Sequence, residues 1–243
     1  MHKYLRAVGF SSIKNIKHLE PLFKSVIENP DKRIAVCADD SDISAMQIDR
    51  DFGEDIGISM VGELDEAGNF LMEHYFPYVR PDIYVYDGFL EVEERLINKS
   101  YAGISDDSEL SLIFYVQNIV DIDKKRIAPS DTVDAVMLAA LSDRGSILLP
   151  IAQPSEGEDL FSMVETSIIP CGVECELYRI VGTILDVRHV QNLITGERVI
   201  LMNISCNDYK IRLAINEMDL IGEPEKGRRF RGDIWLQGLM LLD

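Results

Sequence analysis

The stretch GRRFRGDIWLQG, residues 227–238, decides the fold of the C-terminal part of this chain. Phe230, Ile234 and Leu236 alternate in it with Arg229, Arg231 and Trp235, a period-two pattern that is typical of a strand with two different faces. The stretch holds the only tryptophan of the 243 residues. It therefore predicts a closing strand with an apolar face and a cationic, aromatic face.

Upstream of this stretch, three further segments have strand character, at residues 178–190, 199–206 and 209–215. Short turn signals separate them, among them Gly196 and the pair Asn207-Asp208, which suit tight hairpin turns. About five strands in so short a segment predict a small OB-like β-barrel. An SH3-like barrel, or a sheet layered onto the rest of the chain, remains an alternative.

The first part of the chain mixes one helix with several strands. Apolar residues at helical spacing from Ile16 to Ile27 predict an amphipathic helix, with Ser12 or Asn15 as its cap. Residues 56–76 predict a hairpin with its turn at 65–69. Further strands are expected at 34–37, 83–86, 110–116, 135–141 and 146–151, the last two joined by a turn at 142–145. We therefore predict an α+β, mostly antiparallel N-terminal domain.

Charge and composition suggest where the chain divides. The net charge is −18, of which residues 1–169 carry 15 − 31 = −16 and residues 170–243 carry 9 − 11 = −2. The polar run that begins at Pro154 is the best boundary signal. We expect an acidic α+β domain over 1–153, a linker with a short helix ending at Pro170 over 154–170, and an OB-like module over 171–243.

The same composition bears on location and partners. A strongly negative chain is a poor match for nucleic acid or for an anionic membrane surface. The sequence has no apolar run of the length that a membrane-spanning helix needs, and its start lacks the pattern of a signal peptide. We therefore expect a cytoplasmic protein with no membrane association and no cofactor.

The candidate binding surface consists of Arg212, Arg229, Arg231 and Trp235. Cations that hold phosphates and an aromatic ring that stacks a base are what a groove for single-stranded nucleic acid needs. However, the C-terminal segment is itself slightly acidic, whereas such grooves are strongly basic. The alternative is that these residues face the acidic first domain, because arginine forks pair readily with carboxylates.

Two groups of residues could hold a metal. Asp39, Asp40 and Asp42 follow a short strand, and carboxylates in such a loop can bind magnesium. The same loop is equally suited to turns and helix caps. Cys171 and Cys175, with Cys206 or with His189, could form a zinc site, although small packing residues are the alternative. We expect no bound metal.

The two ends of the chain resemble a known family. The opening HKYLRAVGF (residues 2–10) and the closing GRRFRG with WLQG (227–232 and 235–238) are similar to a family of uncharacterised clostridial proteins, a domain of unknown function. The resemblance implies an intracellular bacterial protein. It implies no activity, ligand or catalytic residue.

No recognisable catalytic motif accompanies the charge asymmetry. The sequence therefore favours an uncharacterised, non-enzymatic interaction or binding module, with a protein partner or self-association as its expected mode. Two alternatives stay open: a nucleic-acid-binding OB-fold protein, and a metal-dependent enzyme that uses the loop from Asp39 to Asp42.

Overall fold

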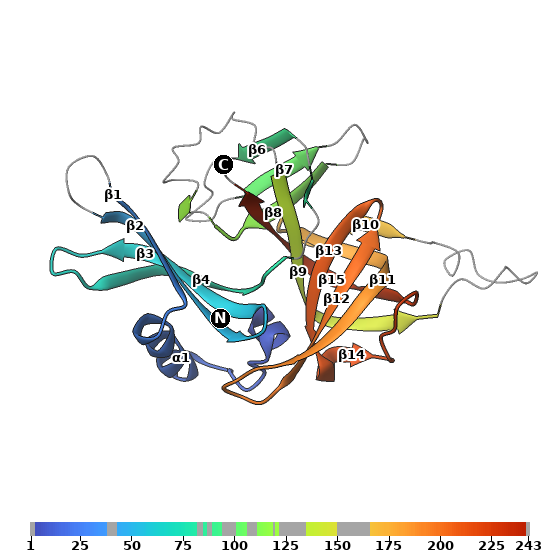
Figure 1. The fold of residues 1–243 in the computed structure, drawn as a ribbon, viewed down its shortest axis with the longest axis horizontal. Coiled ribbons are helices and arrows are strands. Elements are labelled where there is room, and N and C mark those ends of the chain that lie inside the picture. Colours follow the sequence, from blue (N-terminus) through green and yellow to red (C-terminus); the bar gives the residue numbers. More distant parts are fainter. Residues whose placement is uncertain are drawn as a thin grey trace, which may run out of the picture.

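The computed structural model in Figure 1 describes most of the chain in nine ranges. These are residues 3–37, 43–81, 85–86, 89–93, 101–105, 111–118, 120–121, 135–149 and 166–241. The candidate metal residues Asp39, Asp40 and Asp42 lie outside the described residues, as do positions 150–165, which include most of the expected linker.

A four-stranded antiparallel sheet, here called sheet A, forms the core of the N-terminal part. Its strands are β1 (Lys32–Cys37), β2 (Ile43–Gly53), β3 (Ile56–Leu64) and β4 (Phe70–Val79), in that order. The predicted hairpin of β3 and β4 is confirmed. Its turn is held by the carboxylate of Asp65, which accepts from the backbone N–H groups of Ala67 and Asn69.

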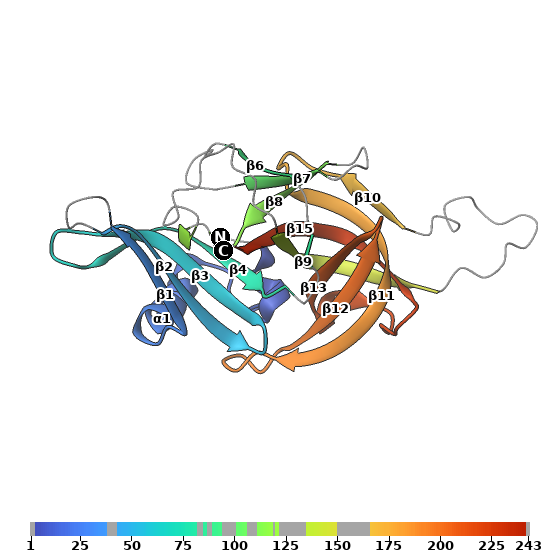
Figure 2. The same cartoon turned by 45° about the horizontal axis from the view of Figure 1, so that its top comes forward.

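Helix α1 (Ile16–Glu28) lies beside sheet A, as Figures 1 and 2 show. Asn15 is its N-cap and accepts a hydrogen bond from the backbone N–H of His18, which satisfies one free donor of the first turn. The helix buries Leu19, Leu22 and Val26, and Phe23 meets Tyr75 of β4 edge to face. The predicted helix is confirmed, with Asn15 as its cap.

The C-terminal part is a closed five-stranded barrel, which confirms the predicted barrel. Four strands follow one another in the chain: β11 (Leu177–Gln191), β12 (Arg198–Cys206), β13 (Tyr209–Asn216) and β15 (Arg229–Leu241). The fifth, β9 (Ala135–Leu148), pairs antiparallel with β15 and parallel with β13, and β15 also pairs with β11, so the ring closes.

Strand β9 differs from the prediction. The sequence predicted two strands with a turn at 142–145, whereas the structure has one long strand with a bulge opposite Gly232 and Ile234. A Cβ on Gly145 would lie 2.2 Å from the ring of Phe230, so this glycine leaves room for the ring and the strand continues. The prediction of a turn is wrong because the glycine serves close packing instead of chain reversal. β9 also precedes residue 154, so the barrel takes a strand from the part expected to be the first domain.

Several shorter elements complete the structure. β10 (Ser167–Pro170) pairs with β11, so these four residues are a strand where a helix was expected. β8 (Ser111–Val116) runs parallel to β15 and continues through β7 (Tyr101–Ser105) to β6 (Phe89–Glu93). β5 (Val85–Tyr86) and β14 (Leu220–Ile221) pair with β9, and η3 (Glu217–Asp219) precedes β14. Within the described ranges, no helix has the length and apolar character that a membrane crossing requires.

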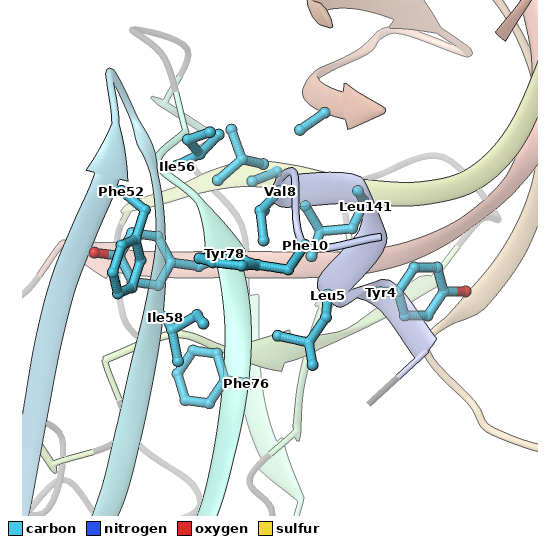
Figure 3. Packing of buried hydrophobic residues seen from close by; sticks show 14 of the residues in the cluster. Tyr4, Leu5, Val8, Phe10, Phe52, Ile56, Ile58, Phe76, Tyr78 and Leu141 are labelled. Carbon is cyan, nitrogen blue, oxygen red and sulfur yellow. The ribbon is translucent and has the colours of Figure 1, made fainter. Parts of the chain in front are cut away.

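The molecule has two hydrophobic clusters. One fills the barrel and includes Phe114, Tyr178, Met202 and Phe230. The other lies between sheet A and the outer face of the barrel, where the short helix η1 (Lys3–Val8) is inserted. Figure 3 shows Leu5, Val8 and Phe10 between the strands of sheet A and the strand that carries Leu141. We call this second interface the seam.

Polar contacts fix the N-terminal segment to the barrel. The side-chain amide of Asn192 donates to the carbonyl of Val8 at 2.8 Å, and the hydroxyl of Thr195 donates to the carbonyl of Gly9 at 2.6 Å. Gly9 has φ +86°, and a Cβ there would lie 2.7 Å from Asn192. This close approach requires glycine, both for its conformation and for space. Sheet A, η1 and the barrel therefore share one continuous interior.

Candidate functional site

Arg212, the first residue of the predicted surface, is buried in the seam. It lies in β13, its side chain is 4% exposed, and its Nη1 is 2.8 Å from Oδ2 of Asp55 in the turn between β2 and β3. Its Nε also donates to Asn203 of the neighbouring strand. Arg212 therefore connects the barrel to sheet A.

Trp235 is also in the seam, at 4% exposure. Its ring stacks on Tyr4 of η1, with centroids 5.5 Å apart, and tilts against Tyr115 at 5.1 Å. Its indole N–H donates to Oε1 of Glu176 at 3.2 Å. In this fold the indole offers no open face on which a base could stack.

The other two arginines lie elsewhere on β15. Arg229 is 7% exposed, and its Nε and Nη2 donate to the carbonyl of Leu149, beyond the end of β9. Arg231 is exposed. The four residues of the predicted surface are thus spread over the seam, a strand end and the solvent side, and the structure does not bring them together.

Metal ligands are not grouped in the described part of the chain. No set of three or more His, Cys, Asp or Glu residues in it could hold an ion. Cys206 is buried in the barrel, where its thiol donates to the carbonyls of Ser167 and Val181. Burial raises the pKa of Cys206 to about 12, which keeps it a neutral thiol.

A cavity of about 210 Å³ lies where sheet A meets β8 and β15. Its wall on the sheet A side is polar and contains Lys32, Gln47, Asp49, Asp55, Tyr78 and Arg80. The opposite wall includes Gln117, Asn118 and Leu239. We call this space the seam cavity. It combines a buried carboxylate, buried amides and cations.

Strand β2 places two of these residues by simple alternation. Gln47 and Asp49 point toward β8, whereas Ile48 and Phe52 take part in the hydrophobic cluster on the side of η1, with Phe52 packed edge to face against Phe10 at 5.1 Å. Successive side chains of a strand point to opposite faces, so one short segment supplies both core and cavity.

Hydrogen bonds of three buried glutamines connect the two walls of the cavity. The Nε2 of Gln47 donates to the backbone carbonyl of Gln117 at 2.8 Å. The Nε2 of Gln117 in turn donates to Oε1 of Gln237, and the Nε2 of Gln237 donates to the carbonyl of Pro77 at 2.9 Å. These bonds cross from β2 to β15 and back to β4, so the wall is held from both sides of the seam.

The side-chain carbonyl oxygen of Gln47 lacks a hydrogen-bond donor among the described residues. Its Nε2 faces the carboxylate of Asp49, the hydroxyl of Ser59 and the carbonyl of Gln117. Two of these partners only accept hydrogen bonds, which fixes the orientation of the amide. The Oε1 is buried and finds no donor in the part of the chain that the structure describes. Leaving such an acceptor unmet costs about 1–3 kcal/mol.

Asp49 is a buried carboxylate, 7% exposed. Loss of solvation raises the pKa of Asp49, and the hydrogen bonds from Ser59 and Gln47 together with the more distant charges of Lys32 and Arg80 oppose that rise. Within the described ranges, no cation lies at ion-pair distance from this carboxylate. Asp49 therefore carries a charge that the described protein groups leave without a direct counter-ion.

Arg80, by contrast, forms an ion pair with Asp51. Its Nη2 lies 2.9 Å from Oδ1 of Asp51, and the hydroxyl of Tyr78 donates to the same oxygen at 2.5 Å. Tyr78 reaches Asp51 by crossing the central strand at Gly57, where a Cβ would lie 2.4 Å from the ring and hydroxyl. Gly57 thus makes room for the Tyr78, Asp51 and Arg80 cluster.

Asp49 differs from the other charged residues that line the seam cavity. The lining cations are Lys32 and Arg80, and the lining carboxylates are Asp49 and Asp55. Lys32 is paired with Asp121, Arg80 with Asp51, and Asp55 with Arg212. Asp49 has no such ion pair in the described ranges.

Comparison with known proteins gives one match. A family model described as a domain of unknown function, E. rectale gene description (DUF3881), matches residues 5–158 and 155–238. The chain belongs to this family. The resemblance seen at the two ends of the sequence is thereby confirmed. No curated protein and no solved structure matches the chain.

The seam cavity of this DUF3881 member is not evident from its sequence. Strand β2 was not predicted, although Met46, Ile48 and Phe52 alternate with Gln47 and Asp49. That alternation could have identified the strand. It could not have identified the site, because polar residues on one face of a strand usually face water. Among the described residues, that face is covered by Gln117 and Asn118, which follow β8, and by Leu239 of β15.

Proposed function

We propose that the protein is a non-enzymatic binding module that holds a small polar ligand in the seam cavity. One observation carries the proposal: the buried carboxylate of Asp49 lines the cavity and has no ion pair among the described residues. A buried charge without a partner destabilises a folded protein. A ligand that reaches Asp49 would offset this destabilisation, so ligand binding is a physical reason for the arrangement.

The other polar side chains of the cavity wall are held in fixed positions, which favours ligand binding over catalysis. Arg80 and Asp55 are held in ion pairs with Asp51 and Arg212. The amide of Asn118 is bound to both backbone groups of Met240. Side chains fixed in this way keep the shape of a pocket constant, and a preformed pocket with a few placed polar groups is typical of ligand sites.

The placement of Arg212 and Trp235 also favours this form of interaction module. Arg212 connects the barrel to the lining residue Asp55 of sheet A, and Trp235 packs η1 and β8 against the barrel. The nucleic-acid alternative depended on an open Trp235, and the burial of that ring counts against it. The alternative that uses Asp39, Asp40 and Asp42 stays a prediction, as do a protein partner and self-association.

Thermal unfolding of the full chain with a panel of small amines, alcohols, carboxylates and sugars tests the proposal. A ligand that binds only the folded state raises the unfolding midpoint with concentration. We expect at least one class of compound to do so in the wild-type protein.

A matched pair of variants assigns the effect to the cavity. Leu239→Phe adds volume to the cavity wall and should abolish the ligand-dependent shift. Leu241→Phe makes the same change two residues along β15, at an exposed position outside the cavity wall, and should leave the shift intact. The proposal fails if no compound raises the midpoint, or if Leu239→Phe responds like the wild type.

A further inference from the structure

We infer that the group recognised in the seam cavity is a protonated amine, which binds between the carboxylate of Asp49 and the carbonyl of Gln47. This inference rests on the proposed function, because it names the chemical class that the same cavity takes. It follows from which atoms of the wall are uncommitted, from the local charge and from the available space.

The uncommitted groups of the buried wall are acceptors. The Oε1 of Gln47 has no donor in the described ranges, while its Nε2 lies within hydrogen-bond distance of three acceptors. The neutral donors beside it are already occupied, because the hydroxyl of Tyr78 goes to Asp51 and the amide of Gln117 goes to Val79 and Gln237. A ligand that completes this wall therefore has to bring N–H or O–H donors.

The local charge selects a cation among such ligands. Four charged residues line the cavity, and three of them, Lys32, Arg80 and Asp55, are held in ion pairs with residues other than Asp49. A ligand with one positive charge would give Asp49 the ion pair that the described residues do not supply. An ammonium group brings that charge together with several N–H donors, and charge-assisted hydrogen bonds to a buried carboxylate are stronger than neutral ones.

The volume selects an organic ligand over a bare ion. A single water needs roughly 10–15 Å³ of such space, whereas the cavity measures about 210 Å³. Leu239, Pro81 and the ring of Tyr78 supply apolar surface beside the polar groups. An ammonium group on a short carbon chain therefore fits both parts of the wall.

Binding of an amine should depend on pH through Asp49. The ionisable groups that face it are Lys32 from β1, Asp51 from β2, Asp55 from the following turn, and Tyr78 and Arg80 from β4 and its end. Gln117 and Asn118, on the barrel side, do not titrate. Burial raises the pKa of Asp49, and a proton on this carboxyl competes with the ammonium group. The affinity should fall as the pH decreases through that pKa.

Three probes of similar size separate the ligand classes. Propylamine is a cation at neutral pH, 1-propanol is a neutral donor, and propionate is an anion. We expect propylamine to raise the unfolding midpoint of the full chain and to give a calorimetric binding signal. We expect no response to 1-propanol or propionate at the same concentration, and none to potassium chloride at equal ionic strength.

Charge-removing variants assign the amine to its site. Asp49→Asn keeps the shape and the hydrogen bond with Gln47 while it removes the charge, and it should weaken propylamine binding at least tenfold. Glu66→Gln removes one negative charge in the exposed turn after β3 and should not change it. Asp49→Asn should also remove the pH dependence of binding.

The outcomes separate this inference from the proposed function. The protein could instead bind 1-propanol or propionate but not propylamine, and Leu239→Phe could block that binding. This result would overturn the inference, and the cavity would still be a ligand site. Binding of propylamine that is unchanged in Asp49→Asn also overturns it. A response to potassium chloride equal to that of propylamine would show a cation site without selectivity for amines. If no compound of any class binds, both proposals fail.

Discussion

The barrel interior and the seam are both enclosed, but they are built from different residues. The barrel interior is filled by aliphatic and aromatic side chains such as Phe230 and Ile234. The seam contains similar residues, and in addition Arg212, Asp49 and a chain of glutamines. Apolar packing is sufficient for stability, and buried ions often stabilise no better than apolar residues of similar volume. The polar content of the seam is the basis of the ligand site proposed above.

The largest effect should come from the barrel interior. Phe230 is fully buried between Gly145 and Gly232. Phe230→Ala removes its contacts and leaves a cavity, because the glycines have no side chains with which to fill it. We expect a loss of about 3–5 kcal/mol in the free energy of unfolding, measured by urea denaturation. A loss below about 1 kcal/mol would show that the barrel can collapse around the missing ring.

A smaller effect is expected for the ion pair of the seam. Asp55→Asn removes the charge that faces Arg212, whose side chain is 4% exposed, and it tolerates the positive φ of 63° at this position. We expect a loss of about 2 kcal/mol, because a buried guanidinium loses its counter-ion. The double variant Asp55→Asn with Arg212→Met should recover most of this loss. If it does not, the pair contributes more than charge compensation.

The two interiors should also differ in their response to pH. Burial raises the pKa of Asp49 in the folded state above its unfolded value of about 3.9. Between these two pKa values the folded state binds more protons than the unfolded state. The contribution of Asp49 to stability is therefore fully present below pH ~3.9 and decreases as the pH rises through the folded pKa.

Urea denaturation of the ligand-free protein across this pH range provides the measurement. Asp49→Asn should be the more stable protein at neutral pH, and its advantage over the wild type should shrink as the pH is lowered. An advantage that does not change with pH would mean that Asp49 keeps its usual pKa, and the seam would then resemble an ordinary polar interface.

The smallest effect should come from outside both interiors. Arg179 and Asp233 form a two-bond pair on the barrel surface, at 2.7 and 3.1 Å, and Arg179 is mostly exposed. Arg179→Met should lower the free energy of unfolding by less than about 1 kcal/mol. The same urea measurement in high salt should show no larger effect, because salt screens exposed pairs.

The sequence predicted the barrel well because its strands have strong local signals. Asn207 and Asp208 both adopt positive φ in the turn between β12 and β13, as their residue types suggest. Phe230, Ile234 and Leu236 all point into the barrel, as the alternation predicted. Trp235 and Arg212 face the other way, also as expected, but the pattern alone could not show that η1 and sheet A cover that face.

The seam cavity could not be predicted from the sequence, for a related reason. Gln47 and Asp49 resemble solvent-facing residues of a half-exposed strand, and their burial depends on β8 and β15, which follow much later in the chain. The sequence also could not show that β9 is one continuous strand, because a glycine such as Gly145 suits a turn as well as a close contact with Phe230. Local sequence patterns predict strands and helices and which of their faces is apolar. What covers a face depends on contacts between segments that are distant in the sequence.

The position of β9 in the barrel has a consequence for how the protein forms during synthesis. β9 ends at Leu148, and its partner β15 begins at Arg229, 229 − 148 = 81 residues later. At 5–20 residues per second, a ribosome needs roughly 4–16 s to make that stretch. During this delay β9, whose first half from Ala135 to Leu141 is an unbroken apolar run, lacks its barrel neighbours β13 and β15. Barrel closure is therefore a late event in folding, and β9 is the segment that a chaperone has most reason to protect.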